Sequence, residues 1–273
     1  SDVCSSDLTL RGPGMKWWGM KTTYSACAAA AVLLFAAPLV AVPAFAASAP
    51  IRDVNNPTGH AGIIAIAKRG AKIEFYDAQT HELKAALPVE QNPHEVAISP
   101  DHKTAYVSVY GLGVYGDNPH PGHAVLVVDL ATQKVVDEID TRPFVAPHGL
   151  QVDASGNLYV SCDSSEVLLM IDPKTHIVKA NLETDGTGHW AVITSDGKKA
   201  YVSNKDNKPY ITAIDLQTQR VLTHIPAPNG AEGIAVSPDG KRVVAAEHNR
   251  PWLMVIDAAT DQVIDHIQLQ GYP

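Results

Sequence analysis

One short pattern recurs five times along the chain and restricts its fold more than any other feature. In each copy an apolar run ends in Asp, and Thr follows three residues later: Asp77 and Thr80, Asp129 and Thr132, Asp172 and Thr175, Asp215 and Thr218, Asp257 and Thr260. Successive Asp residues are 52, 43, 43 and 42 positions apart, and an insertion at residues 111–123 lengthens the first interval. A period of about 40 to 45 residues is typical of β-propeller blades.

Each repeat contains four short apolar runs separated by turn residues. In the copy at residues 188–222 the runs are residues 190–194, 200–204, 210–214 and 219–222. Short runs of this kind predict strands, and the turns between them predict a four-stranded antiparallel meander. One such sheet cannot cover both of its own faces, so the blades must pack against one another around an axis. We therefore predict an all-β fold, a β-propeller of four-stranded antiparallel blades.

The second run of several repeats carries a recognisable motif. Residues 200–204 read Ala-Tyr-Val-Ser-Asn, and Tyr-Val-Ser recurs at residues 106–108 and 159–161. Ser-Pro-Asp turns precede two of the second runs, at residues 99–101 and 237–239. Over about residues 63–273 the chain thus resembles the YVTN repeat propellers, a YncE-like and lactonase-like family with seven blades. The resemblance implies a propeller fold, but such propellers include lactonases, lyases, metal and haem proteins and binding scaffolds.

The first 46 residues have the features of a targeting segment. Residues 1–14 have no periodicity, and we interpret them as a non-native leader. Residues 15–46 contain a basic start, an apolar stretch and a small-residue cleavage site at Ala46, which together predict a signal peptide. We expect a periplasmic or secreted protein with no stable membrane span after cleavage. The alternative is a transmembrane anchor, against which the alanine-rich, proline-interrupted composition argues.

Charge and cysteine content narrow the functional classes. The whole chain has a formal net charge of −8, and removing residues 1–46 makes it about −9, because three basic and two acidic residues are lost. An acidic protein lacks the basic surface that general nucleic-acid binding requires. Of the three cysteines only Cys162 lies beyond residue 46, so no disulfide within the mature chain is expected. We expect Cys162 to be a buried small side chain rather than a nucleophile.

The repeat register divides the rest of the chain. Residues 47–61, rich in Pro and Asn, form a lead-in, and residues 62–273 form the propeller domain. The first repeat has runs only at residues 62–67, 72–77 and 84–89, so we expect one three-stranded blade followed by four complete ones. We interpret the domain as incomplete, a truncated product, since seven blades would need about 70 to 90 further residues.

The first residues of the innermost strands form the most informative set. In a meander these residues lie on the same side of the propeller as the loop between the second and third strands. We call this side the upper face. Equivalent positions there are occupied by His94, His148, His189 and Glu232. Imidazoles and a carboxylate are suitable ligands for a divalent metal, with the three histidines as its ligands, and they also suit ligand binding or general base catalysis. The alternative is that they cap the backbone of the neighbouring blade.

The upper-face loops add further polar groups. We predict that Asp163, Asn204 and Glu247 take part in ligand binding with the four strand-start residues; neighbouring loop residues are Glu166, Lys205, Asp206, His248 and Asn249. The insertion at residues 111–123 suits a long loop over the channel, as a lid or an added binding edge. Its Asp117, His120 and His123 are a second candidate metal set, and an elongated hairpin is the simpler interpretation.

Three functions follow from these observations. We favour an exported propeller that binds a small molecule or an exported protein partner on its upper face without turning it over. The second is a lactonase-like hydrolase or lyase, with or without a divalent metal. The third is a propeller that carries a metal or redox cofactor. Against the second, no nucleophile with an adjacent base is evident, and against the third, no Cys-x-x-Cys-His motif occurs.

Overall fold

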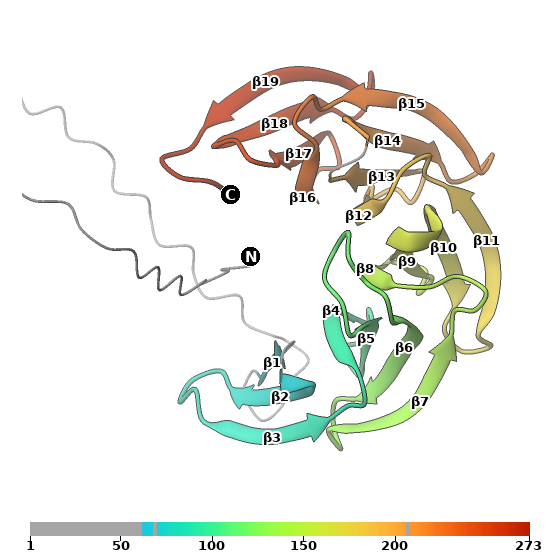
Figure 1. Ribbon diagram of the computed structural model, residues 1–273, viewed down its shortest axis with the longest axis vertical. Coiled ribbons are helices and arrows are strands. Elements are labelled where there is room, and N and C mark those ends of the chain that lie inside the picture. The colour runs from blue at the N-terminus through green and yellow to red at the C-terminus, as the bar shows by residue number, and fades with distance from the viewer. Residues whose placement is uncertain (1–61, 68–69, 206–207) are drawn as a thin grey trace, which may run out of the picture. The chain divides into compact units, whose positions relative to one another are not determined.

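The computed structural model describes residues 62–67, 70–205 and 208–273, the first range through its backbone only. They form one three-stranded and four four-stranded antiparallel sheets, each built from consecutive strands (Figure 1).

The first blade comprises β1 (Gly62–Ala67), β2 (Lys72–Asp77) and β3 (Leu83–Pro88). The second comprises β4 (Asn92–Ile98), β5 (Thr104–Gly111), β6 (Pro121–Asp129) and β7 (Lys134–Asp140). The third comprises β8 (Pro147–Val152), β9 (Leu158–Cys162), β10 (Val167–Asp172) and β11 (Ile177–Glu183). The fourth comprises β12 (Gly188–Ile193), β13 (Lys199–Asn204), β14 (Tyr210–Asp215) and β15 (Arg220–Pro226). The fifth comprises β16 (Ala231–Val236), β17 (Arg242–Glu247), β18 (Trp252–Asp257) and β19 (Gln262–Gln268).

The predicted all-β fold and the predicted blade order are confirmed. The innermost strands of neighbouring blades, β4, β8, β12 and β16, contact one another in sequence. The leader, signal peptide and lead-in predicted for residues 1–61 lie outside the described residues. The described residues include no helix of the length and apolar character that crossing a membrane requires.

The recurring Asp makes the turn between the last two strands of every blade. In the fourth blade, Oδ1 of Asp215 accepts the backbone N–H groups of Gln217 and Thr218, both at 2.8 Å. The fourth residue after the Asp has a left-handed backbone in all five copies, with φ between 54° and 59°: His81, Gln133, His176, Gln219 and Asp261. A short carboxylate that bonds its own turn explains why this position is repeatedly Asp.

The outermost strand is the most exposed of each four-stranded blade. Every residue of β9 is buried, whereas β19 is mostly exposed, as an outer edge should be. Apolar side chains pack between neighbouring blades, where Tyr201 and Ile211 of the fourth blade share a core with Ile234 of the fifth. Cys162 is fully buried, and burial raises the pKa of its thiol, as expected for a structural cysteine.

In the second, third and fourth blades, one serine fastens the inner strand of its own blade to that of the next. The backbone N–H of Gly149 donates to Ser161 Oγ at 2.8 Å, and Ser161 Oγ donates to the carbonyl of His189 at 2.9 Å. Ser108 makes the same pair of bonds with Glu95 and His148, and Ser203 makes them with Trp190 and Glu232. This is the serine of the Tyr-Val-Ser motif. It holds the first residues of adjacent inner strands at fixed positions.

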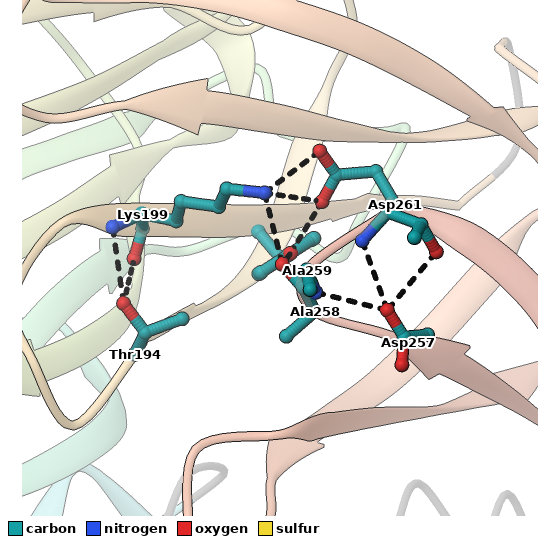
Figure 2. A network of polar contacts seen from close by, with 8 residues as sticks. Thr194, Lys199, Asp257, Ala258, Ala259 and Asp261 are labelled. Carbon is teal, nitrogen blue, oxygen red and sulfur yellow. Dashed lines mark hydrogen bonds and ion pairs between the residues drawn. The ribbon is translucent and has the colours of Figure 1, made fainter.

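A second contact joins the fourth and fifth blades (Figure 2). Lys199 Nζ lies 2.8 and 2.9 Å from the carboxylate oxygens of Asp261 and donates to the carbonyl of Ala258 at 2.9 Å. The hydroxyl of Tyr201 donates to the same carboxylate at 2.5 Å. Burial, followed by this hydrogen bond, raises the pKa of Tyr201. Since Asp261 follows the Asp257 turn, the turn of one blade anchors the second strand of its neighbour.

Candidate functional site

The structure brings together the three histidines that the repeat register singles out. The ring centres of His94 and His148 are 3.7 Å apart, and those of His148 and His189 are 4.2 Å apart. His148 is 0% exposed and His189 is 5% exposed, so the row lies inside the protein rather than in open solvent. We call this row, together with Glu232, the channel mouth. Its regular spacing follows from the serine bonds, which end on the carbonyls of His148, His189 and Glu232.

The ends of the second strands supply a further set of equivalent residues. Two positions after the motif serine, or after Ala246 in its place, stand Tyr110, Asp163, Lys205 and His248. Each contacts a polar group at or beside the channel mouth. The last three are among the upper-face loop residues expected from the sequence, whereas Tyr110 is not. The signal that would have found it is its register, which matches that of Asp163.

Glu232 is held by two basic side chains. Lys205 Nζ donates to Oε1 at 2.9 Å, and His248 Nδ1 lies 3.0 Å from Oε2. Burial opposes ionisation of Glu232, but the hydrogen bonds from Lys205 and His248 outweigh it and lower the pKa to about 2. Glu232 is therefore an ionised carboxylate at neutral pH, and Lys205 is its counter-charge.

Asp163 differs from Glu232 in that its pKa is raised rather than lowered. It is 3% exposed, and burial raises its pKa even though Tyr110 and Ser164 hydrogen-bond to it. The hydroxyl of Tyr110 donates to Oδ2 at 2.7 Å, and that of Ser164 donates to Oδ1 at 2.9 Å. Burial, followed by the bond to Asp163, also raises the pKa of Tyr110. The pair joins the second blade to the third beside the histidine row.

The insertion forms a short hairpin on an extended β5–β6 pair. Strand β5 runs to Gly111 and β6 begins at Pro121, so the elongated hairpin is the interpretation that the backbone supports. Val114 and Asp117 pair across the tip. Asn118 braces it, because its Oδ1 accepts the Gly113 N–H at 3.0 Å and its Nδ2 donates to the Tyr110 carbonyl at 2.9 Å.

Tyr115, at the tip of this hairpin, reaches the fourth blade. Its hydroxyl is 2.7 Å from Thr187 Oγ1 and 3.1 Å from the Thr187 carbonyl. Its ring meets His189 edge-on with centres 5.0 Å apart, and Lys205 Nζ lies 5.2 Å from the ring centre. The hairpin therefore starts in the second blade, passes the third and is fixed to the fourth.

A pocket of about 390 Å³ lies under this hairpin. Its walls are formed by Tyr110, Tyr115, Gly116, Asn118, Asp163, Ser164 and Thr187. Of the predicted ligand-binding residues, Asp163 lines this pocket. The aromatic and amide groups of the hairpin were not predicted individually, because their position depends on how the insertion folds back.

Asn204 and Glu247, also predicted to bind ligand, lie inside their own blades. Asn204 Nδ2 donates to the Tyr210 carbonyl at 3.0 Å and to Thr212 Oγ1 at 3.1 Å. Glu247 is 6% exposed and accepts a hydrogen bond from Asn229 Nδ2 at 2.8 Å. Both hold a strand end in place, and neither contributes to the pocket wall.

The predicted metal sites find no matching geometry. Within the described part of the chain, no three His, Cys, Asp or Glu side chains are placed to hold a metal ion. His94 Nδ1 lies 3.3 Å from the Glu95 carboxylate, and His123 of the insertion lies 3.4 Å from Asp140. Asp117 takes part in the hairpin bridge. Metal binding by His94, His148 and His189 stays a prediction.

Comparison with known proteins agrees with the fold. The family model of YNCE-like beta-propellers matches residues 158–273. Among solved structures, the hydrazine synthase of Kuenenia stuttgartiensis is similar, with 27% sequence identity and a TM-score of 0.57. That match covers 65% of this chain and 49% of the other, so it spans about half of the hydrazine synthase chain. A search of curated proteins found no match. The predicted resemblance to YncE-like propellers is confirmed.

Proposed function

We propose that this protein is a binding scaffold that holds a small molecule in the pocket beside the channel mouth. The observation that carries the proposal is the fixed hairpin: Tyr115 is bonded to Thr187 across the third blade and forms part of the wall of a pocket of about 390 Å³. Small-molecule pockets commonly measure about 300 to 1,000 Å³ and combine apolar walls with a few placed polar groups. Here two tyrosine rings supply the apolar wall, and Asp163 and Asn118 supply polar groups.

The rigidity of the strands around the pocket supports a role in ligand binding. The residues around the pocket come from the second, third and fourth blades, whose inner strands are joined by buried serine bonds. A pocket built on such strands loses little conformational freedom when a ligand enters, which favours affinity.

Hydrolysis or elimination is the second candidate, and Asp163 is the reason. A buried carboxylate with a raised pKa at a pocket wall has the property of a general base. Cys162 is not a candidate nucleophile, since it is fully buried and its pKa is raised. The Ser164 hydroxyl donates to this carboxylate at 2.9 Å, but no histidine is among the residues that line the pocket, so binding is the better-supported function.

The location of the protein is part of the proposal. The signal peptide expected at residues 15–46 supports export to the periplasm or beyond. N-terminal sequencing of the protein from fractionated cells tests this. A first residue of Ala47 in the exported fraction supports export, whereas an uncleaved chain in the cytoplasm or the membrane refutes it.

Binding is tested by thermal unfolding with a panel of amines, carboxylates, alcohols and sugars. A ligand at 100 times its Kd adds about 2.7 kcal/mol, and each kcal/mol raises the Tm of a domain this size by about 2 to 4 °C. At least one compound should stabilise the wild-type protein and fail to stabilise Tyr115→Ala. The control is Tyr272→Ala, since Tyr272 is 74% exposed. An absence of stabilisation, or equal stabilisation of all three proteins, refutes the site. Mass spectrometry of the recovered compound separates binding from turnover.

A further inference from the structure

We propose that the pocket takes a small organic cation, a protonated amine, with Asp163 as its counter-charge. This inference rests on the proposed function and specifies its ligand.

The charge of the pocket wall is the first argument. Apart from two tyrosines, Asp163 is the only ionisable residue among those that line the pocket. Each of its oxygens accepts one hydroxyl hydrogen bond, from Tyr110 and from Ser164. The backbone N–H of Ser164 also bonds to this carboxylate. Since a carboxylate has about four acceptor positions, capacity for a further donor is left. A protonated amine supplies such donors together with the opposite charge.

Burial of Asp163 is the second argument. Its 3% exposure means that its charge has lost most of its hydration. A cation in contact with the carboxylate compensates for that loss, whereas an anion adds repulsion to it. Lys205 lies beside the Tyr115 ring of the pocket wall, but its ammonium group is already paired with Glu232 at 2.9 Å. The pocket therefore discriminates against anions.

The aromatic wall is the third argument. Lys205 Nζ lies 5.2 Å from the centre of the Tyr115 ring, so this ring already accepts a cation on one side. The ring of Tyr110 forms another part of the wall next to Asp163. Cations are attracted to the faces of aromatic rings within about 6 Å. A carboxylate flanked by tyrosine rings is an arrangement suited to an ammonium group.

The test uses three probes with the same benzyl or phenyl group and different charge: benzylamine, benzyl alcohol and benzoate. Calorimetric titration at pH 7 compares their affinity for the wild-type protein. We expect benzylamine, protonated at this pH, to bind about 10- to 100-fold more tightly than benzyl alcohol, and benzoate to bind most weakly. Asp163→Asn keeps the size of the side chain and an acceptor for Tyr110. It should abolish the preference for the amine over the alcohol.

Two further variants make the result interpretable. Asp265→Asn removes an exposed carboxylate on β19 and should leave all three affinities unchanged. Tyr115→Leu should weaken benzylamine binding about threefold or more. This variant replaces Asp163→Asn as the test if circular dichroism shows that Asp163→Asn does not fold.

The outcomes separate the ligand class from the binding function. If benzyl alcohol or benzoate binds as tightly as benzylamine, the cation proposal is overturned and binding at the pocket stands. If benzylamine binds Asp163→Asn as tightly as wild type, Asp163 is not the counter-charge and the proposal is likewise overturned. If none of the three probes binds, the cation proposal fails, and the broader panel with Tyr115→Ala decides the binding function independently.

Discussion

Replacing Ser161 by Ala tests the bond that sets the spacing of the channel mouth. Ser161 is fully buried, and its hydroxyl accepts from Gly149 and donates to the carbonyl of His189 in the next blade. The variant removes both bonds and creates only a very small cavity. Gly149 has no water to bond instead, because it is buried as well.

The size of the effect follows from these two contacts. A buried hydrogen bond contributes about 1 kcal/mol net, and a buried group that loses its partner costs about 1 to 3 kcal/mol. We therefore expect Ser161→Ala to lower the free energy of unfolding by about 2 to 3 kcal/mol. The matched control is Ser155→Ala, an exposed serine in the turn before β9, which should change stability by less than about 0.5 kcal/mol.

Urea unfolding followed by tryptophan fluorescence measures both variants. Trp190 follows His189 and is partly buried, so its emission reports on this part of the fourth blade. A shift in the midpoint with an unchanged m-value indicates a change in stability alone. If Ser161→Ala is as stable as Ser155→Ala, the serine bonds do not stabilise the contact between blades, and our account of the histidine row is wrong.

Two further predictions concern the fifth blade. Gly230→Ala should lower the free energy of unfolding by more than about 2 kcal/mol, because φ is 74° and an added Cβ would lie 1.7 Å from the Lys205 carbonyl oxygen. Gly233→Ala meets no atom within 4 Å, so urea unfolding should show little change; equal effects would contradict the packing argument. The pKa of Glu232 is lowered from 4.5 to about 2 in the folded state, so its contribution to stability is complete above pH 4.5 and is lost as pH falls toward 2. Urea midpoints of wild type and Glu232→Gln should therefore converge between pH 5 and pH 2.5, and parallel curves would refute this.

Much of the fold could be predicted from local sequence. The Asp of each third turn bonds its own backbone two and three residues ahead, so its chemistry is complete within one turn. Apolar runs and turns set the strands of each blade, and the period sets their number. Register alone also identified His94, His148, His189 and Glu232 as equivalent, because a repeat places equivalent residues at equivalent heights.

Other features required contacts between distant parts of the chain. Nothing in the sequence distinguishes Asn204 and Glu247, which bond within their blades, from Asp163, which lines the pocket. The bond between Tyr110 and Asp163 joins residues 53 positions apart, and that between Tyr115 and Thr187 joins residues 72 positions apart.

The sequence by itself determined the blades and the residues that each presents on the upper face. Only the tertiary structure decided that the insertion of the second blade passes the third blade and bonds to the fourth. That arrangement decides which residues line the pocket. The physical reason is range. Turns and strand alternation depend on neighbours within a few residues, whereas the pocket depends on the packing of separate sheets, whose spacing is set by buried side chains from both sides.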